Sequence, residues 1–299
     1  MATLTARDVA REHYLRQQAN ARRTADAVQA WWGELDPADL DASWSRVGPG
    51  VALITSAGQA LAAGQADDYT AAVLAAQGVD PAAAGQVDPL AFSGTASDGR
   101  PLASLLYEPV IAAKVAIAGG AGVDDAMLAG LASMLRIVGT QVQDAGRTAD
   151  GVAITARRHV GGYVRMLDPP SCGRCAILAG AWYRWNTGFD RHPHCDCVHV
   201  PANEGAAGDL RTDPRRYFDS LHPADQDRLF TQDGARAIRD GADINRVVNA
   251  RRGMTAAGDR LLTREAAGRR LRLMPEQIYA DAADRDDAIR LLHRFGYLT

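Results

Sequence analysis

All four cysteines of this 299-residue chain lie between residues 172 and 197, and this clustering constrains the fold more than any other feature. Cysteines that fill a core or build a disulfide framework would be scattered along the chain. Here they alternate with histidines, and the first residues of the chain lack the apolar run of an export signal. Clustered cysteine and histidine in a chain that stays in the cytosol favours a metal site.

The spacing of the cluster is that of a zinc site. Cys172 and Cys175 stand two residues apart, so they can hold one ion from a tight turn in which Gly173 lets backbone amides face the thiolates. A second ligand pair about 12–20 residues later completes the usual structural zinc site. Thiolate and imidazole ligands together favour Zn²⁺ over Mg²⁺ or Ca²⁺.

The second ligand pair has more candidates than positions, because a tetrahedral ion takes four ligands. The competing side chains are His192, His194, Cys195, Cys197 and His199. We expect the metal ligands to be Cys172, Cys175 and His192, with one of Cys195 or Cys197 as the fourth.

Two local features bear on that choice without deciding it. In an extended segment Cys195 and Cys197 point the same way, whereas His194 points to the opposite face. His192 precedes a proline, which restricts its backbone to an extended form and suits a rigid ligand. The fourth ligand therefore stays open between the two cysteines.

Other chemistries for the cluster are disulfides, reduced thiols packed as small apolar groups, and a redox Cys-x-x-Cys pair. We disfavour the redox pair because no strand–helix pattern places Cys172 and Cys175 at a helix N-terminus. A catalytic zinc keeps an open position beside a carboxylate base, and Asp190 and Asp196 are near. Since thiolate-rich sites are typically closed, we expect a structural metal and no enzymatic activity.

The remaining sequence predicts a mainly α fold in two domains. Residues 1–150 show helical patterns at about 5–35, 38–77 with an interruption at 48–50, 101–118 and 124–146, with a loop at 78–100. A further helix is expected at 150–166 and short helices at about 214–221, 223–230, 234–240, 244–252, 263–270, 275–283 and 284–295. We predict a helical N-terminal bundle over residues 1–150 and an α-rich (α+β) domain over 151–299, organised around the Cys/His metal knot.

Charge is distributed unevenly along the chain. Residues 1–150 hold 10 basic and 17 acidic side chains, a net charge of −7, and residues 151–299 hold 23 basic and 19 acidic, a net charge of +4. A protein that coats DNA needs a strongly basic face, which the N-terminal half does not provide. No stretch approaches the ~20 apolar residues of a membrane span. The C-terminal half permits local contact with phosphate.

The cluster contains Cys-x-x-Cys, followed by a Leu-Ala-Gly run, an aromatic segment and His-Pro-x-Cys-x-Cys. This series of motifs resembles a known family, the MuF-like minor capsid proteins of tailed phages, also called phage head morphogenesis proteins. The resemblance covers about residues 150–299. Later segments resemble an actinobacteriophage branch of the family: residues 217–221, 237–243, 247–253 and 294–297.

The resemblance implies a structural minor capsid protein, assembled in the host cytoplasm and held in few copies inside the head near the portal. Its implied partners are the portal protein, the major capsid or scaffolding protein and packaged DNA, with no membrane and no small-molecule substrate. It supplies no catalytic mechanism. Two alternatives from the residues alone are a zinc-dependent hydrolase or nuclease acting on phage DNA or cell wall, and a zinc-ribbon DNA-binding module.

Overall fold

The computed structural model describes residues 4–167, 170–186, 197–207, 210–250, 254–257, 260–264, 271–273, 275–295 and 298. The fold is mainly α, as predicted. The chain divides into unit 1, residues 1–166 and 183–210, and unit 2, residues 167–182 and 211–299. Among the described residues, none of the helices combines the length and the apolar character needed to cross a membrane.

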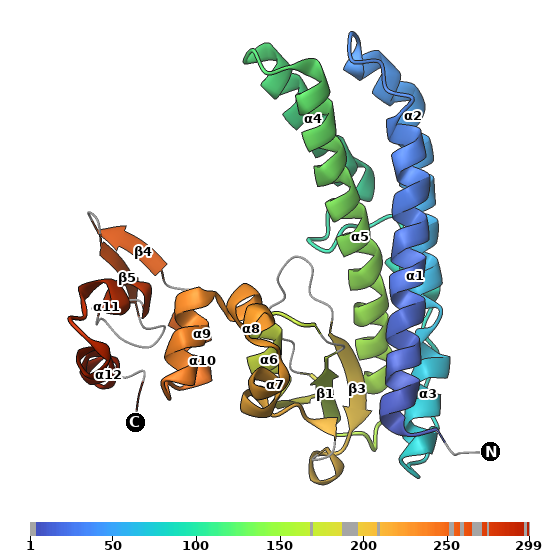
Figure 1. The fold of residues 1–299 in the computed structure, drawn as a ribbon. Coiled ribbons are helices and arrows are strands. Elements are labelled where there is room, and N and C mark those ends of the chain that lie inside the picture. Colours follow the sequence, from blue (N-terminus) through green and yellow to red (C-terminus); the bar gives the residue numbers. More distant parts are fainter. Residues whose placement is uncertain are drawn as a thin grey trace. The chain divides into compact units, whose positions relative to one another are not determined.

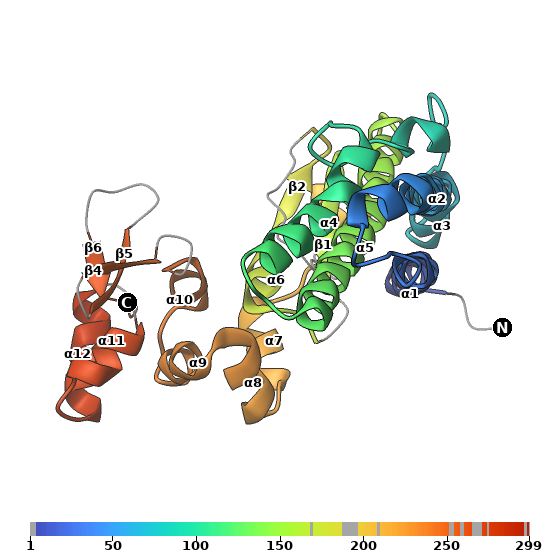
Figure 2. The same ribbon diagram turned by 90° about the horizontal axis from the view of Figure 1, so that it is seen from above.

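Four long helices build unit 1: α1 (Ala6–Trp32), α2 (Leu40–Ala63), α4 (Leu102–Ala118) and α5 (Val123–Thr155). They lie side by side, and a shorter helix, α3 (Ala66–Ala76), continues the line of α2 (Figures 1 and 2). The short 3-10 helix η1 (Pro89–Phe92) lies in the loop between α3 and α4 and packs on α2. The bundle is thus a set of long helices joined by short connections and one longer loop.

Helix α1 begins at the capping box that the sequence predicted. The Thr5 side chain accepts a hydrogen bond from the Asp8 amide, and the Asp8 carboxylate accepts one from the Thr5 amide. These two reciprocal bonds satisfy backbone donors that the first turn leaves without a partner. The hydrogen bonds from Thr5 lower the pKa of the Asp8 carboxyl, so the cap is charged at neutral pH.

Helix α2 corrects the predicted interruption at residues 48–50. The helix passes through Pro49 without a break and ends instead at Gly64. A Cβ added at Gly48 would lie 2.7 Å from the Trp44 ring. A Cβ added at Gly50 would lie 2.6 Å from the Trp31 ring. Packing against two tryptophans outweighs the weak helix propensity of a Gly-Pro-Gly run.

Helix α5 corrects two further predictions. It is one helix of 33 residues, with no break near 147–149, and it includes residue 150, where the sequence placed a domain boundary. The helix predicted at 150–166 ends at Thr155, and its second part forms strand β1 (Gly162–Met166). All five β1 residues are buried. In a short segment that is buried on both faces, the periodicity of apolar residues does not distinguish a strand from a helix.

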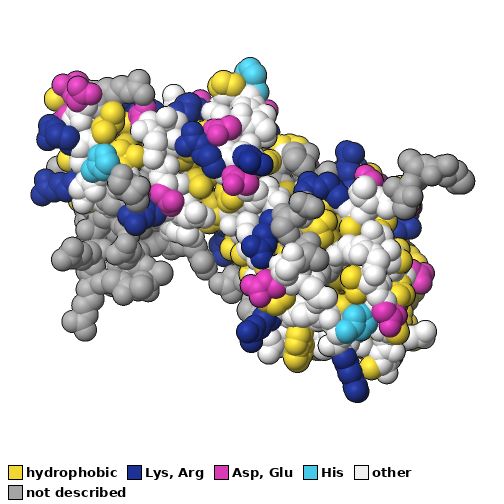
Figure 3. Space-filling view, turned by 90° about the horizontal axis from the view of Figure 1, so that it is seen from below, with side chains coloured by type: hydrophobic (Ala, Val, Ile, Leu, Met, Phe, Trp, Pro, Cys, Tyr) yellow, Lys and Arg dark blue, Asp and Glu magenta, His cyan; other side chains and the backbone are white. Residues whose placement is uncertain are grey.

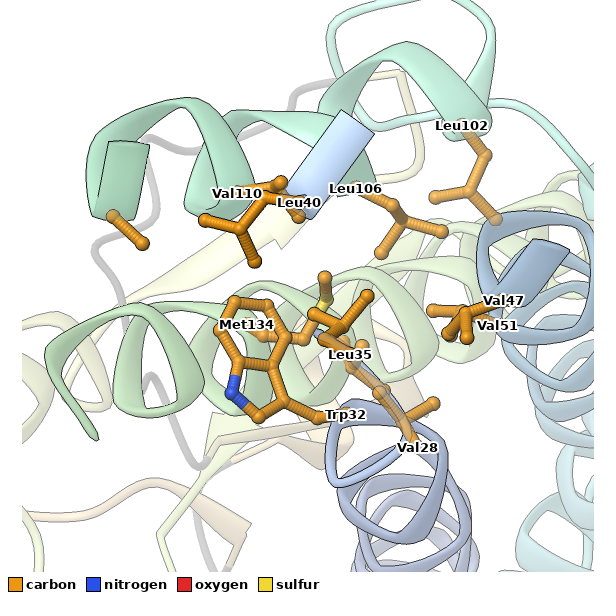
Figure 4. Packing of buried hydrophobic residues seen from close by; sticks show 12 residues of the cluster. Val28, Trp32, Leu35, Leu40, Val47, Val51, Leu102, Leu106, Val110 and Met134 are labelled. Carbon is orange, nitrogen blue, oxygen red and sulfur yellow. The ribbon is translucent and has the colours of Figure 1, made fainter. Parts of the chain in front are cut away.

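The largest apolar core of unit 1 lies where α1 ends, α2 begins and α4 packs on α5 (Figure 4). Helix–helix contact here is made by branched side chains around one tryptophan. Its members are Val28, Trp32, Leu35, Leu40, Val47, Val51, Leu102, Leu106, Val110, Ala113, Met134 and Val138. Burial of such side chains stabilises the bundle by roughly 1.5–3 kcal/mol each.

Gly130 of α5 allows this close packing, and we expect Gly130→Val to lower the free energy of unfolding by about 1–3 kcal/mol. A Cβ at Gly130 would lie 2.8 Å from the Trp32 ring and 3.2 Å from the Pro109 carbonyl oxygen. The matched control is Gly139→Val on the same helix, where nothing lies within 4 Å of the added Cβ. Thermal unfolding followed by circular dichroism compares the two, and equal melting temperatures would contradict the packing account.

A three-stranded sheet packs against the lower part of the bundle (Figure 1). Its order is β2 (Trp182–Arg184), β1, β3 (Val198–Ala202), and β1 and β3 are antiparallel with Arg165 opposite His199. Strand β3 is therefore an edge of the sheet, and it contacts α1, α3 and α5. A 3-10 helix, η2 (Glu204–Ala206), follows β3.

Unit 2 is a set of short helices with a small antiparallel sheet. The helices are α6 (Gly173–Leu178), α7 (Pro214–Ser220), α8 (Pro223–Phe230), α9 (Gln232–Arg239), α10 (Ile244–Ala250), α11 (Pro275–Asp281) and α12 (Arg285–Arg294). The sheet consists of β4 (Met254–Ala257), β5 (Arg260–Arg264) and β6 (Leu271–Leu273) in that order. The helix predicted at 263–270 is wrong at its start, because pairing with both neighbours holds residues 260–264 in a strand.

Candidate metal centre

The structure brings together two of the five predicted metal ligands. Cys172 and Cys175 lie in one turn of unit 2, Cys197 lies in unit 1, and His192 and Cys195 fall outside the described residues. Within the described ranges, no three His, Cys, Asp or Glu side chains are grouped so that they could hold a metal ion. Of the predicted metal ligands, only Cys172 and Cys175 lie together in the part of the chain that the structure describes.

The Cys172–Cys175 turn has the backbone geometry expected of a thiolate pair. Cys172 is the N-cap of α6, and its sulfur accepts a hydrogen bond from the Cys175 amide, with a nitrogen–sulfur distance of 3.5 Å. Cys172 is half-buried and Cys175 is buried. An amide that points at the sulfur stabilises the anionic form, which is the form that binds metal.

This position corrects one premise of the sequence analysis. The pair does lie at a helix N-terminus, because α6 begins at Gly173 directly after Cys172. The argument that disfavoured a redox pair therefore fails. A thiolate at the start of a helix suits a zinc ligand and a redox cysteine equally.

Aromatic residues of α7 and α8 fix the turn from outside. The Tyr217 hydroxyl accepts a hydrogen bond from the Ser171 amide at 2.6 Å and donates one to the Ser171 carbonyl at 2.7 Å. Gly173 lies against Phe230, where an added Cβ would stand 2.8 Å from the ring. Phe230 meets Phe218 edge to face at 5.1 Å between ring centroids. The glycine between the cysteines is thus required by packing against Phe230.

The segment that follows the cysteine turn, residues 179–180, contacts residues 212–214. The Thr212 amide donates to the Ala179 carbonyl at 3.2 Å, and a Cβ at Gly180 would meet Pro214 at 3.3 Å. Residues of the segments that resemble the phage family are buried in unit 2: Tyr217, Phe218, Ala237, Ile238, Val247 and Ala250. These residues therefore contribute to the interior of unit 2.

Cys197 has a different environment, because its sulfur lies against a buried guanidinium. Arg165 of β1 donates to the Cys197 sulfur from Nη2 at 2.8 Å and from Nε at 3.2 Å. Arg165 is fully buried and Cys197 is 1 % exposed. Arg165 also bonds the Tyr183 hydroxyl, whose pKa is raised by burial. An arginine stays protonated in proteins, so this site holds a permanent positive charge.

Side chains of the helices bind the outer edge of β3, where alternate carbonyl groups face the bundle. The three bonds run from Arg147 Nε to the Cys197 carbonyl at 3.2 Å, from the Tyr69 hydroxyl to the His199 carbonyl at 2.7 Å, and from Gln77 Nε2 to the Pro201 carbonyl at 2.9 Å. An edge strand leaves such groups available for pairing with another chain. Here α3 and α5 occupy this edge and fix the position of the segment that carries Cys197.

A buried polar pair supports the same junction. His13 Nε2 of α1 lies 3.1 Å from Asp150 Oδ2 of α5, and their side chains are 1 % and 3 % exposed. The His13 ring stacks on Tyr69 with 3.8 Å between centroids. Burial, together with the Asp150 charge, raises the pKa of the Tyr69 hydroxyl well above its usual range, so this group remains a donor. The buried ionisable side chains His13 and Asp150 thus lie where the helices of unit 1 pack against the sheet.

Sequence analysis missed this buried set, although the chain carries a signal for it. Asp150 stands between the small residues Ala149 and Gly151 of α5, and Arg165 stands inside the run 163–167 of apolar and aromatic residues. A charged residue within an apolar run is rarely buried without a partner. The partners themselves, His13 and Cys197, are distant in sequence and could not be paired from it.

No family model, curated protein or solved structure matches this chain.

Proposed function

We propose that the chain is a structural minor capsid protein of a tailed phage, of the MuF-like head morphogenesis type, with a structural zinc site. The observation that carries the proposal is the place of the resembling segments. Tyr217 and Phe218, which belong to them, bind and surround the cysteine turn in unit 2. A structural zinc organises an irregular segment that has few core residues of its own, because metal binding contributes directly to folding.

For the zinc shell we propose Cys172, Cys175, His192 and Cys195. Cys197, the other candidate for the fourth position, already faces two N–H donors of Arg165. A guanidinium that touches a sulfur repels a second cation at the same sulfur. This assignment leaves Cys197 as a partner of Arg165 within unit 1.

Proteins are the partners that the surface of the chain favours. Figure 3 shows basic and acidic side chains interspersed over the face in view, in place of one continuous basic field. Several large apolar side chains of the long helices are exposed, including Val115 and Leu128. Exposed apolar residues mark protein contacts more often than nucleic-acid contacts. Portal, major capsid or scaffolding protein in the interior of the head are the partners we propose.

Metal analysis of the purified chain tests the zinc site. We expect one zinc per chain, lost in Cys175→Ser and in Cys195→Ser. The control Arg165→Met keeps its zinc, because the Arg165 partners Cys197 and Tyr183 are outside the proposed shell. Elemental analysis by mass spectrometry, run beside circular dichroism, gives the stoichiometry of the folded protein. Full zinc in both cysteine variants would contradict the assignment.

The same preparations separate the two alternative functions. A zinc-dependent hydrolase or nuclease would cut DNA or cell wall, and a folded Cys175→Ser variant would be inactive. A zinc-ribbon DNA-binding module would bind DNA tightly, with an affinity that falls steeply as salt rises. The structural proposal expects neither turnover nor such a salt dependence.

A further inference from the structure

The outward face of α2 is apolar along most of the helix. No charged residue occurs between Arg46 and Asp67. The exposed residues from 47 to 64 share apolar or absent side chains, and we call them the α2 stripe: Pro49, Leu53, Ala57, Leu61 and Gly64. They follow each other at intervals of three or four residues, so they form one row of about 22 Å on the helix.

Such a face is unusual for a helix on a protein surface. The other sides of α2 pack on α1, α4, α5 and η1, so the α2 stripe is the side left to solvent. Leu53 is 71 % exposed and Leu61 is 64 % exposed. An amphipathic surface helix places polar residues on its outer face, and an apolar outer face indicates a covering partner.

We propose that the α2 stripe binds a second copy of this chain, with the two α2 helices antiparallel. The stripe is symmetric about Ala57, because Leu53 stands four residues before it and Leu61 four residues after it. A two-fold interface requires such a self-complementary patch, in which each Leu53 meets Leu61 of the other copy. The small side chain of Ala57 lets the helices approach where they cross.

Charge at the two ends of the stripe supports the same pairing. Arg46 lies eleven residues before Ala57 and Asp68 eleven residues after it, and both are exposed. Among the described residues Arg46 bonds only the Ala42 carbonyl, and Asp68 forms no ion pair. Helix α3, which carries Asp68, continues α2 and packs like it on α1 and α5 (Figure 1).

The direction of pairing follows from these charges. Antiparallel helices bring Arg46 of each copy toward Asp68 of the other, two attractions of opposite charge per dimer. Parallel helices would place like charges together at both ends, which is repulsive. A partner of different sequence gains nothing from the symmetry of the stripe, and this favours a second copy as its occupant.

Size-exclusion chromatography with light scattering tests the proposal on the full chain. We expect a dimer whose dissociation constant rises at least about tenfold in Leu53→Glu/Leu61→Glu. The control Val115→Glu/Leu128→Glu alters two side chains of equal exposure, 67 % and 66 %, on α4 and α5, and it keeps the dimer. Circular dichroism establishes that both variants are folded.

A charge exchange then tests the direction. Arg46→Glu weakens the dimer, and adding Asp68→Arg to it restores the wild-type dissociation constant. A wild-type chain that stays monomeric at about 0.1 mM, or a dimer that the Leu53/Leu61 variant leaves unchanged, overturns the proposal. A monomer that instead binds a capsid component through the stripe overturns it as well. None of these results depends on zinc or on presence in a virion.

Discussion

Replacing Cys197 with alanine is expected to lower the free energy of unfolding of unit 1 by about 3–5 kcal/mol, well above the ~1 kcal/mol of an average substitution. The loss of stability comes from Arg165, the partner of Cys197 that remains in the variant. Arg165 is fully buried and cannot lose its proton, so removal of the sulfur leaves its positive charge without the group that accepts from Nε and Nη2. The volume lost with the thiol accounts for a small part of the effect.

The double variant Arg165→Met/Cys197→Ala isolates this cause. It removes the charge together with its acceptor, and replacing both members of a buried polar pair by apolar groups costs little. We expect the double variant to be more stable than Cys197→Ala alone. Hydrogen exchange of peptides from β1 and β3 measures the local free energy of opening, which suits a chain of two units. Additive losses in the double variant would show that Arg165 does not depend on Cys197.

The variant His13→Leu is expected to cost a similar amount, about 3–5 kcal/mol, because it leaves the buried Asp150 carboxylate without its imidazole. The effect should appear as faster hydrogen exchange in α1 and α5, which the pair joins. It should extend to β3, since Tyr69 stacks on His13 and donates to the His199 carbonyl. A control on the same helix is Arg22→Leu, at an exposed position of α1.

A double-mutant cycle with Asp150→Leu completes this test. If the pair acts as a unit, His13→Leu/Asp150→Leu loses less stability than the two single variants together, by an interaction energy of about 1–3 kcal/mol. The result that contradicts the account is a His13→Leu protein as stable as wild type. It would mean that Asp150 has another buried partner.

Local signals in the sequence predicted much of the helical structure correctly. The capping box at Thr5 and Asp8 placed the start of α1, and the proline and aspartate signals placed α7, α8, α11 and α12. These signals work because they concern hydrogen bonds within one helical turn. The mainly α fold class followed from the same periodic segments.

Failures arose where distant residues decide local structure. Pro49 remains helical because Trp31 and Trp44 pack on the glycines beside it, and Trp31 belongs to a different helix. Residues 162–166 and 260–264 become strands through pairing with other segments of the chain. Short buried segments carry no period of their own, so their partners determine their conformation.

In the candidate site, too, local spacing predicted the local geometry and did not predict the contacts with distant residues. The Cys-x-x-Cys spacing predicted a turn with an amide facing a sulfur, and the structure has one. Spacing could not distinguish Cys195 from Cys197, because both have the same parity in an extended segment. What distinguishes Cys197 is Arg165, a residue of another strand that lies against its sulfur.

Mass spectrometry of purified phage particles tests the central claim, that this chain is a structural component of a phage head. The account predicts its peptides in intact, nuclease-treated particles, in few copies. Absence of the chain from purified particles at any copy number, while the portal protein is detected in the same sample, would contradict it.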